Sequence, residues 1–316
     1  MNINGPMKAP STSLPVNTFV QKKSKLKRND WIWGYFMIAP TLIGLLALYI
    51  WPSFHTFYLS FTKWQAFGNY EWDGLANYER MLQDAELLNT LKNTFTYTIV
   101  SVPVSISIAI VIAVFLNQKI KGLSFYRTIY FLPVVTIPAA IAMVWKWLYA
   151  DKYGLINYIL GLFSIDGTNW LTNPDTALFS IVVVSVWMHV GYYTIFFLSG
   201  LQGIPQTLYE AASIDGAGVF RKFFKITLPL LTPTIFFVAI ISLIDALQVF
   251  DLVFMMIEPT SPVQGQTRTL VVLFFEQAFE ANNKGYASAI ACFIFLIIFI
   301  ITLIQVKLQK KWVHYE

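Results

Sequence analysis

The sequence has few of the residues that soluble proteins, disulfide scaffolds and metal sites require. Only 12% of its 316 residues are charged, whereas soluble globular domains usually carry about 25%. One cysteine, Cys292, rules out a disulfide framework, and the only histidines are His55, His189 and His314. The patterns Gly-x-Ser-x-Gly and His-Glu-x-x-His are absent, so the sequence predicts neither a catalytic site nor a metal site.

What the chain has in abundance is long apolar runs, since 56% of its residues are hydrophobic. A helix crosses the ~30 Å hydrocarbon layer with about 20 apolar residues. The stretches that meet this requirement run approximately over Trp31–Trp51, Thr94–Leu116, Thr128–Tyr149, Ala177–Ser199, Thr232–Ile257 and Tyr286–Val306. The sequence therefore predicts an all-α, multi-pass membrane protein with six transmembrane helices, in which residues 30–312 form one membrane domain.

The distribution of lysine and arginine predicts how the helices are oriented, because cytoplasmic loops carry an excess of basic residues. Basic residues precede the first stretch, follow the last one, and occur in two alternate loops: Lys119, Lys121 and Arg127, then Arg221, Lys222 and Lys225. Both termini are therefore expected in the cytoplasm, with residues 1–29 as a disordered basic tail and 313–316 as a short C-terminal tail. We attribute the net charge of +5 to the basic residues that orient the helices in the membrane and that attract anionic lipid, and we expect no nucleic-acid partner.

The connection between the fourth and fifth stretches, residues 200–231, is expected to be structured. Pro205 suits the first turn of a helix, which good helix formers continue to Asp215. Gly216 and Gly218 interrupt it, and a second short amphipathic run ends at Pro229. Two short helices at an angle would form a protrusion on the cytoplasmic face. The alternative from the pattern alone is a helix pair that lies along the membrane surface.

Within this loop, the spacing of particular residues resembles the signature of ABC importer permease subunits. That signature is Glu-Ala-Ala, three residues, Gly, nine residues, Ile, one residue and Leu-Pro. This sequence matches it with Glu210, Ala211, Ala212, Gly216, Ile226, Leu228 and Pro229. The neighbouring segments 201–205 and 214–217, and Tyr286–Ala289, resemble the carbohydrate branch, which includes maltose, multiple-sugar and glycerol-phosphate systems. Residues 48–52 and 58–62 resemble the first of the two permease subunits in such systems.

The resemblance implies a type I ABC importer permease fold in the bacterial plasma membrane. The chain lacks a phosphate-binding loop, so ATP and Mg would bind to a partner, and no cofactor is expected here. The implied partners are a homologous second permease, two cytoplasmic ATP-binding subunits, an extracellular or periplasmic solute-binding protein, and a carbohydrate. Glu210 would pair with a basic residue of the ATPase, Ala211 and Ala212 would keep the helix slim, Gly216 would allow the turn, and Asp215 would cap the second helix. The alternatives are a solvated charge at Glu210 and ordinary helix formers at the two alanines.

Polar residues in the fourth and fifth stretches predict where a solute passes, because such groups are costly in lipid and tend to line cavities. Ser185, His189, Tyr192 and Phe196 fall on one helical face. Ser242, Asp245 and Val249 do the same, with Gln248 and Asp251 beside them. Hydroxyl, amide, carboxylate and aromatic groups suit a sugar. The alternatives are hydrogen bonds between neighbouring helices or, for the aspartates, contacts with the second permease.

The sequence thus predicts one transmembrane half of an ATP-driven importer for a sugar or oligosaccharide. No basic residue is apparent in mid-membrane, which favours a neutral solute over an anionic one. A permease for glycerol phosphate or another non-sugar solute is the nearest alternative. An ion-coupled secondary transporter, which would need paired intramembrane carboxylates or inverted repeats, is another. A structural or receptor subunit of the membrane is the third.

Overall fold

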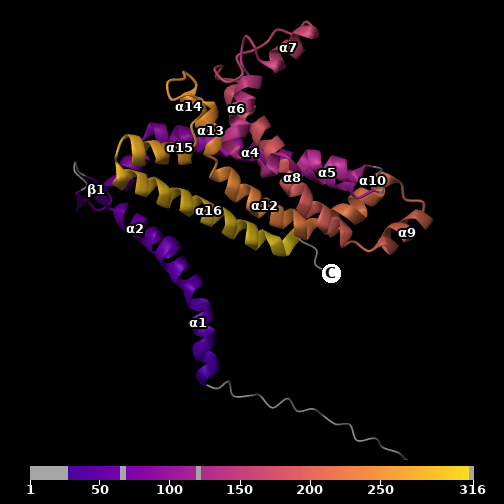
Figure 1. Cartoon of the computed structure of the whole chain (residues 1–316), viewed down its shortest axis with the longest axis horizontal. Coiled ribbons are helices and arrows are strands. Elements are labelled where there is room, and N and C mark those ends of the chain that lie inside the picture. The colour runs from indigo at the N-terminus through magenta and orange to yellow at the C-terminus, as the bar shows by residue number, and fades with distance from the viewer. Residues whose placement is uncertain (1–27, 65–68, 119–121, 313–316) are drawn as a thin grey trace, which may run out of the picture. The chain divides into compact units, whose positions relative to one another are not determined.

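The computed structural model describes residues 28–64, 69–118 and 122–312, and these are mostly helical (Figure 1). One two-stranded antiparallel sheet interrupts the helices, with β1 (Thr62–Trp64) paired to β2 (Tyr70–Trp72). The all-α class is therefore confirmed for the described part of the chain. The predicted tails lie outside the described residues, except that Arg28 and Asn29 already belong to the first helix.

The chain divides into two compact units, residues 1–53 and 54–316, whose boundary falls inside α2. The first unit contains α1 (Arg28–Leu45), the π-helical turn η1 (Leu46–Ile50) and the start of α2 (Trp51–Leu59). Together they give an apolar helix of 29 residues, Trp31–Leu59, that is long enough to span a membrane. The first predicted stretch lies within it.

The second unit holds the remaining helices. After α3 (Ala76–Gln83) come α4 (Ala85–Leu116), α5 (Leu123–Phe131), the 3-10 turn η3 (Pro133–Val135), α6 (Pro138–Leu148), α7 (Leu155–Leu162) and α8 (Ala177–Gln202). Next are α9 (Gln206–Ile214), α10 (Val219–Lys222), the π turn η4 (Phe223–Thr227), α11 (Leu228–Leu230), α12 (Thr232–Leu247) and α13 (Asp251–Met256). The last are α14 (Gln264–Thr267), α15 (Leu270–Phe275), the π turn η5 (Glu276–Glu280) and α16 (Lys284–Trp312).

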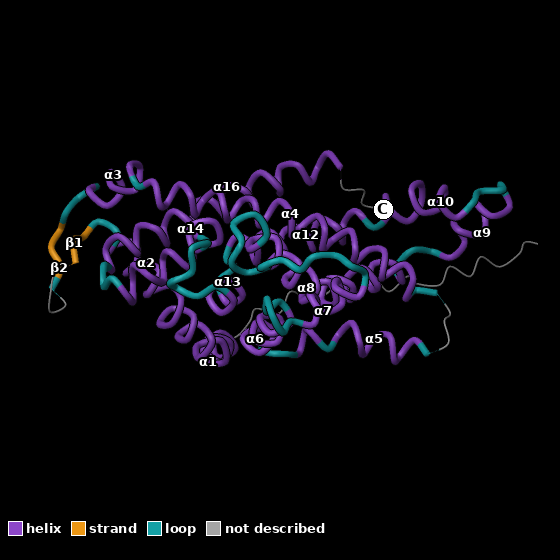
Figure 2. The backbone as a smooth tube through the Cα atoms, turned by 90° about the horizontal axis from the view of Figure 1, so that it is seen from above, coloured by secondary structure: helices purple, strands orange, loops and turns teal. Residues whose placement is uncertain are grey.

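The long helices α4, α8, α12 and α16 run along the second unit, with α4 packed against α8 and α12 (Figures 1 and 2). The β1–β2 sheet and α3 lie at one end of this unit, and α9 and α10 lie at the other (Figure 2). Fully buried small residues of α4, Ala109 and Ala113, belong to the same core cluster as Ile181, Val184 and Phe197 of α8. Small residues let membrane helices approach closely, and dispersion contacts then hold them together.

Four helices in the described residues are long and apolar enough to cross a membrane: Trp31–Leu59, Ala85–Leu116, Ala177–Gln202 and Lys284–Lys310. A fifth candidate is the pair Val219–Leu230 and Thr232–Leu247, which is bent by 65°. The structure therefore shows four or five candidate spans rather than six continuous helices.

The predicted third and fifth stretches are helices that stop partway. The third, Thr128–Tyr149, is divided into α5, η3 and α6, because Pro138 lacks an N–H and forces the residue before it into an extended conformation. The fifth, Thr232–Ile257, ends as α12 at Leu247 and resumes as α13 only at Asp251. Hydropathy averaged along the sequence does not reveal either interruption, because apolar residues flank both of them.

The two helices that follow these interruptions, α6 and α13, pack against each other. At their far ends Lys146 Nζ donates to Glu258 Oε1 at 2.8 Å. This hydrogen bond and the charge of Lys146 hold the pKa of Glu258 below its usual range. Arg268 in turn pairs with Glu86 of α4 and with Glu276, while burial raises the pKa of Glu276 and the charge of Arg268 opposes that rise.

We predict that Gly191→Ala destabilises the fold. A Cβ at Gly191 of α8 would overlap the carbonyl oxygen of Tyr130 in α5, and overpacking of this kind costs about 1–3 kcal/mol. The matched control is Gly161→Ala in α7, where an added Cβ meets nothing within 4 Å. Thermal unfolding of the purified protein in detergent should show a lower midpoint for Gly191→Ala alone, and equal midpoints would contradict this packing.

Candidate functional site

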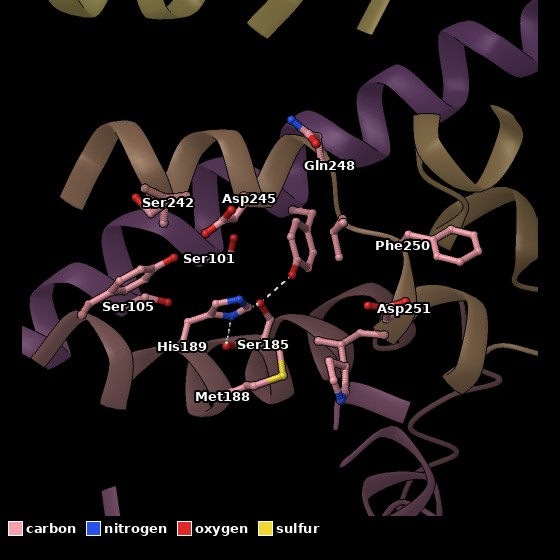
Figure 3. Close-up of a pocket in the computed structure, with 17 residues that line it drawn as sticks. Ser101, Ser105, Ser185, Met188, His189, Ser242, Asp245, Gln248, Phe250 and Asp251 are labelled. Atoms are coloured by element: carbon pink, nitrogen blue, oxygen red, sulfur yellow. Dashed lines mark hydrogen bonds between the residues drawn. The ribbon is translucent and has the colours of Figure 1, made fainter. Parts of the chain in front are cut away.

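A cavity of about 360 Å³ lies among α4, α6, α8, α12 and α13 (Figure 3). The sequence-predicted residues that line it are Ser185 and His189 of α8, Ser242 and Asp245 of α12, and Gln248 and Val249 at the interruption after α12. Two helices thus bring their polar stripes to one space, as their spacing predicts. The volume falls within the range of about 300–1,000 Å³ that is usual for small-molecule sites.

Tyr192 and Phe196, the other two predicted residues, do not line this cavity. Their rings meet edge to face at 5.0 Å between centroids, and Phe196 packs on Phe237 of α12 at 5.3 Å. They follow His189 toward the α9 end of α8, where the two helices make aromatic contact. Any role of these two rings in a solute path lies beyond the cavity itself.

A third polar stripe, which sequence reasoning missed, comes from α4. Tyr97, Ser101 and Ser105 line the cavity at intervals of four residues, the spacing of one helical face. Tyr97 donates its hydroxyl hydrogen to Ser185 Oγ at 2.5 Å. Ser101 is only 3% exposed, and its Oγ has no hydrogen-bond partner among the described residues. The spacing of four residues was the signal in the sequence. Serines in an apolar helix, however, are equally typical of hydrogen bonds between neighbouring helices.

The contacts of His189 determine which of its ring nitrogens faces the cavity as an acceptor. Its Nδ1 lies 2.8 Å from the carbonyl oxygen of Ser185. A carbonyl oxygen only accepts, so Nδ1 carries the hydrogen and, in the neutral ring, Nε2 is left as an acceptor. The ring also stacks on Tyr193 at 5.9 Å. Figure 3 shows the imidazole directed into the space that Asp245 faces from α12.

The arrangement suits binding rather than bond-breaking chemistry. Ser185 Oγ lies 3.4 Å from His189 Nδ1, but the proton on Nδ1 already points to a carbonyl, so this nitrogen is no base for the serine hydroxyl. The groups around the cavity are hydroxyls, an imidazole, an amide, two carboxylates (Asp245 and Asp251) and aromatic rings. Together they can exchange hydrogen bonds with a hydroxylated solute and cover its apolar face.

The signature residues lie on the protrusion that follows the C-terminal end of α8. Glu210 and Ala211 are exposed on α9, and Ala212 is half-buried. Gly216 has φ +71°, a left-handed conformation that favours glycine. Ala217 N–H donates to the carbonyl of Ala212 at 2.8 Å, which closes the helix end in the usual way for such a turn. The predicted break at Gly216 is confirmed.

The predicted capping role of Asp215 is wrong. Asp215 ends α9, whereas α10 begins after Gly218, and no side chain caps it. The remaining signature residues lie further along: Ile226 is in the π turn η4, and Leu228 and Pro229 form the first turn of α11. The second helix is therefore a short α turn that widens into a π turn.

Two side-chain hydrogen bonds hold the halves of this protrusion together. The hydroxyls of Tyr209 and Thr227 lie 2.9 Å apart, and Lys222 Nζ donates to Ser213 Oγ at 2.7 Å. At the tip, large apolar side chains stand in the open: Ile214 is 88% exposed, Val219 82% and Phe220 78%. A braced protrusion with an apolar tip and an exposed carboxylate is suited to docking into another protein.

A bundle of membrane-length helices, a polar cavity among them and a braced protrusion at one end define a membrane permease. The chain belongs to the family described as binding-protein-dependent transport system inner membrane components, whose model matches residues 86–314. The resemblance read from the signature is thereby confirmed, and the protein is a multi-pass membrane component of such transport systems.

Similarity to individual relatives extends over nearly the whole chain. It is 38% identical to the probable ABC transporter permease protein YesP of Bacillus subtilis, over 93% of this chain and 96% of the relative. It is 35% identical to the trehalose/maltose transport system permease protein MalF of Thermococcus litoralis, over 91% and 97%. It is 30% identical to the sn-glycerol-3-phosphate transport system permease protein UgpA of Salmonella typhimurium, over 92% and 97%.

A solved structure confirms the fold. A chain of a bacterial ABC transporter involved in the import of the acidic polysaccharide alginate superposes with a TM-score of 0.81. The match covers 90% of this chain and 96% of that one at 22% identity. The type I ABC permease fold that the signature implied is therefore present.

We predict that Tyr97→Phe lowers stability and Tyr193→Phe does not. The first change removes a buried hydroxyl that donates to Ser185, and such a bond contributes about 0.5–1.5 kcal/mol. The second removes a hydroxyl at the same cavity that has no hydrogen bond within the described ranges. Thermal unfolding midpoints of the two variants provide the comparison. A smaller loss for Tyr97→Phe than for Tyr193→Phe would count against this bond.

Proposed function

We propose that this chain is the first of two permease subunits of an ATP-driven importer that carries a sugar or oligosaccharide across the plasma membrane. The observation that supports this most is the cavity, which presents hydroxyl, amide, carboxylate and aromatic groups from α4, α8 and α12. A sugar has both hydroxyl edges and an apolar C–H face, and this set can engage both. The trehalose/maltose permease among the relatives agrees with such a solute.

Within the cavity, each type of group has a separate role in the proposal. His189 Nε2 and Gln248 would exchange hydrogen bonds with sugar hydroxyls, as would Ser242 from α12. The ring of Tyr193 would cover the apolar face of a sugar ring, a contact that aromatic side chains make readily. Tyr192 and Phe196 would meet the solute later, when α8 and α12 separate on the cytoplasmic side.

The protrusion would receive the work of ATP hydrolysis, so the chain itself performs no catalysis. Glu210 would pair with a basic residue of a cytoplasmic ATP-binding subunit, and Ala211 and Ala212 would let α9 enter a groove on that subunit. The exposed tip formed by Ile214, Val219 and Phe220 would be buried there, which removes apolar surface from water. Two such subunits, a second permease and an external solute-binding protein would complete the system; one solved relative is in complex with a periplasmic protein that binds an alginate pentasaccharide.

Six crossings with both termini in the cytoplasm remain our proposal for the topology. In it α5, η3 and α6 make one interrupted crossing, and α12 with α13 makes another. Non-helical backbone is tolerated at membrane depth where it lines a cavity, and Pro138, Gln248 and Val249 at these interruptions do so. Basic residues of the protrusion, such as Arg221 and Lys225, favour the cytoplasmic side for it.

We predict that single cysteines will report this topology. In a Cys292→Ala background, Tyr153→Cys in the loop before α7 should react with a membrane-impermeant maleimide in intact cells. Ile214→Cys, at the protrusion, should react only after permeabilisation. The two side chains are similarly open, at 83% and 88% exposed. The chain is expressed without its ATP-binding subunits, so that docking does not cover Ile214 and a difference in labelling reports sidedness. Labelling of Ile214→Cys in intact cells would contradict the proposed orientation.

We predict that Glu210→Ala uncouples transport. Removing one partner of a desolvated charge pair weakens docking strongly, so solute uptake and solute-stimulated ATP hydrolysis should both fall by about tenfold or more. Membrane insertion of the chain, measured by fractionation, should persist. The control is Glu71→Ala, which removes an exposed carboxylate from β2 at the other end of the unit. Full uptake by Glu210→Ala would refute the docking role.

A further candidate solute comes from the relatives. The likeness to a glycerol-3-phosphate permease would fit a phosphate-bearing solute. The fold does not distinguish this possibility from a neutral sugar, because similar chains are named for both kinds of solute. The residues around the cavity favour the neutral sugar, because Asp245 and Asp251 line it and no lysine or arginine of the described residues does.

A further inference from the structure

The cavity is acidic. Asp245 of α12 and Asp251 at the start of α13 both line it, and no lysine or arginine is among the described residues around it. The only other group there that can carry charge near neutral pH is His189, whose Nδ1 is held by the carbonyl of Ser185. Two carboxylates with a single histidine as their basic neighbour give the space a negative potential while that histidine is neutral.

Asp245 is exposed within the cavity and available to a solute. It accepts no hydrogen bond within the part of the chain that the structure describes, and its carboxylate turns toward the space that the imidazole of His189 faces (Figure 3). The charge of His189 acts on Asp245 across this space, but no hydrogen bond joins the two side chains in the described part of the chain, so a solute can reach the carboxylate. Asp245 therefore has the geometry of a group that meets the contents of the cavity.

A second feature of the cavity is the row of hydroxyl groups on α4. Ser101 Oγ, almost fully buried on α4, lines the cavity and has no partner among the described residues. A buried hydroxyl without a partner is costly, and the hydroxyl of a solute can supply one. Ser105 lies one turn further along the same face of α4. Hydroxyls and carboxylates together suit a polyhydroxylated solute without negative charge.

We propose that this cavity takes uncharged saccharides and excludes anionic ones such as uronates and phosphates, with Asp245 as the residue that sets this selectivity. The proposal rests on the proposed function and adds the charge class of its substrate. Two like charges about 6 Å apart at an effective dielectric constant of about 20 repel enough to weaken binding about 100-fold. An uncharged sugar meets no such penalty, and its hydroxyls can donate to the carboxylate.

The fold alone does not dictate this selectivity. A chain with the same fold belongs to an importer of alginate, described as an acidic polysaccharide, and another relative is named for glycerol-3-phosphate. The charge of the cavity lining is therefore the property by which one member of the family can differ from another.

The test uses the whole transporter, with this chain, its second permease and its ATP-binding subunits, in lipid nanodiscs. The solute-binding protein is left out, so that any selectivity belongs to the membrane cavity. The complex is equilibrated with a mixture of neutral di- to tetrasaccharides and the uronic acids of the same lengths. Retained sugars are then eluted and quantified by mass spectrometry. The variants are Asp245→Asn, the charge-retaining Asp245→Glu, and Asp175→Asn, which removes an exposed carboxylate just before α8 and outside the cavity.

The wild type, Asp245→Glu and Asp175→Asn should retain neutral sugars almost exclusively. Asp245→Asn should raise the ratio of retained uronates to neutral sugars by about 100-fold, because the repulsion from this one charge is gone. Equal retention of uronates and neutral sugars by the wild type, with no change in Asp245→Asn, would overturn the selectivity while leaving sugar transport intact. Retention of no sugar by any variant would count against the proposed function itself, and with it the selectivity.

Discussion

The structure depends on one constraint: in hydrocarbon, each backbone N–H and carbonyl needs a partner within the protein. Continuous helices meet this requirement, and α8 and α16 are continuous and free of internal proline. The helix α4 is also continuous, except that Pro103 leaves one of its carbonyls without the usual helical donor. The interruptions before α6 and α13 do not meet the requirement, and Pro138, Gln248, Val249 and Phe250 at those interruptions line the cavity. The cavity is thus located where helices stop, because only a polar, enclosed space tolerates backbone that is not helical. The cavity and the breaks in two membrane helices are here one feature.

The same constraint explains why the polar side chains form a network. Tyr97 donates to Ser185 across α4 and α8, and His189 donates to the carbonyl of Ser185 one turn away. These bonds use the hydroxyl hydrogen of Tyr97 and the Nδ1 hydrogen of His189 within the protein, and they leave two acceptors toward the cavity, His189 Nε2 and the carboxylate of Asp245. The walls are therefore fixed by bonds within the protein, while the groups left over match the hydroxyl donors of a solute. A pre-organised site of this kind loses little entropy when it is occupied.

The sequence predicted the parts of this protein in which local chemistry decides the structure. The apolar runs located α4, α8 and α16 to within several residues at their ends, and the spacing of Glu210 to Pro229 located the protrusion. It failed where packing decides. Hydropathy averages across Pro138 and across Gln248, so two interrupted helices were expected to be continuous. The face of α4 that carries Ser101 was missed because a serine in an apolar helix has the same local pattern whether it meets a helix or a cavity. Asp215 was expected to cap α10, but the turn at Gly216 and Gly218 places it at the end of α9.

The protrusion and the cavity are connected through the helices that carry both. α8 brings Ser185 and His189 to the cavity and ends at Gln202, just before α9, while the bent pair of helices leads from Val219 back to α12, which carries Ser242 and Asp245. The bonds from Tyr209 to Thr227 and from Lys222 to Ser213 join the two sides of the protrusion. A force on the protrusion is therefore delivered to α8 and α12 together. Packed interfaces switch between discrete arrangements and do not deform continuously. Such a force would therefore move the polar stripes of α8 and α12 apart or together in one step. The residues of α8 and α12 that line the cavity are in this way carried by the helices that the protrusion joins.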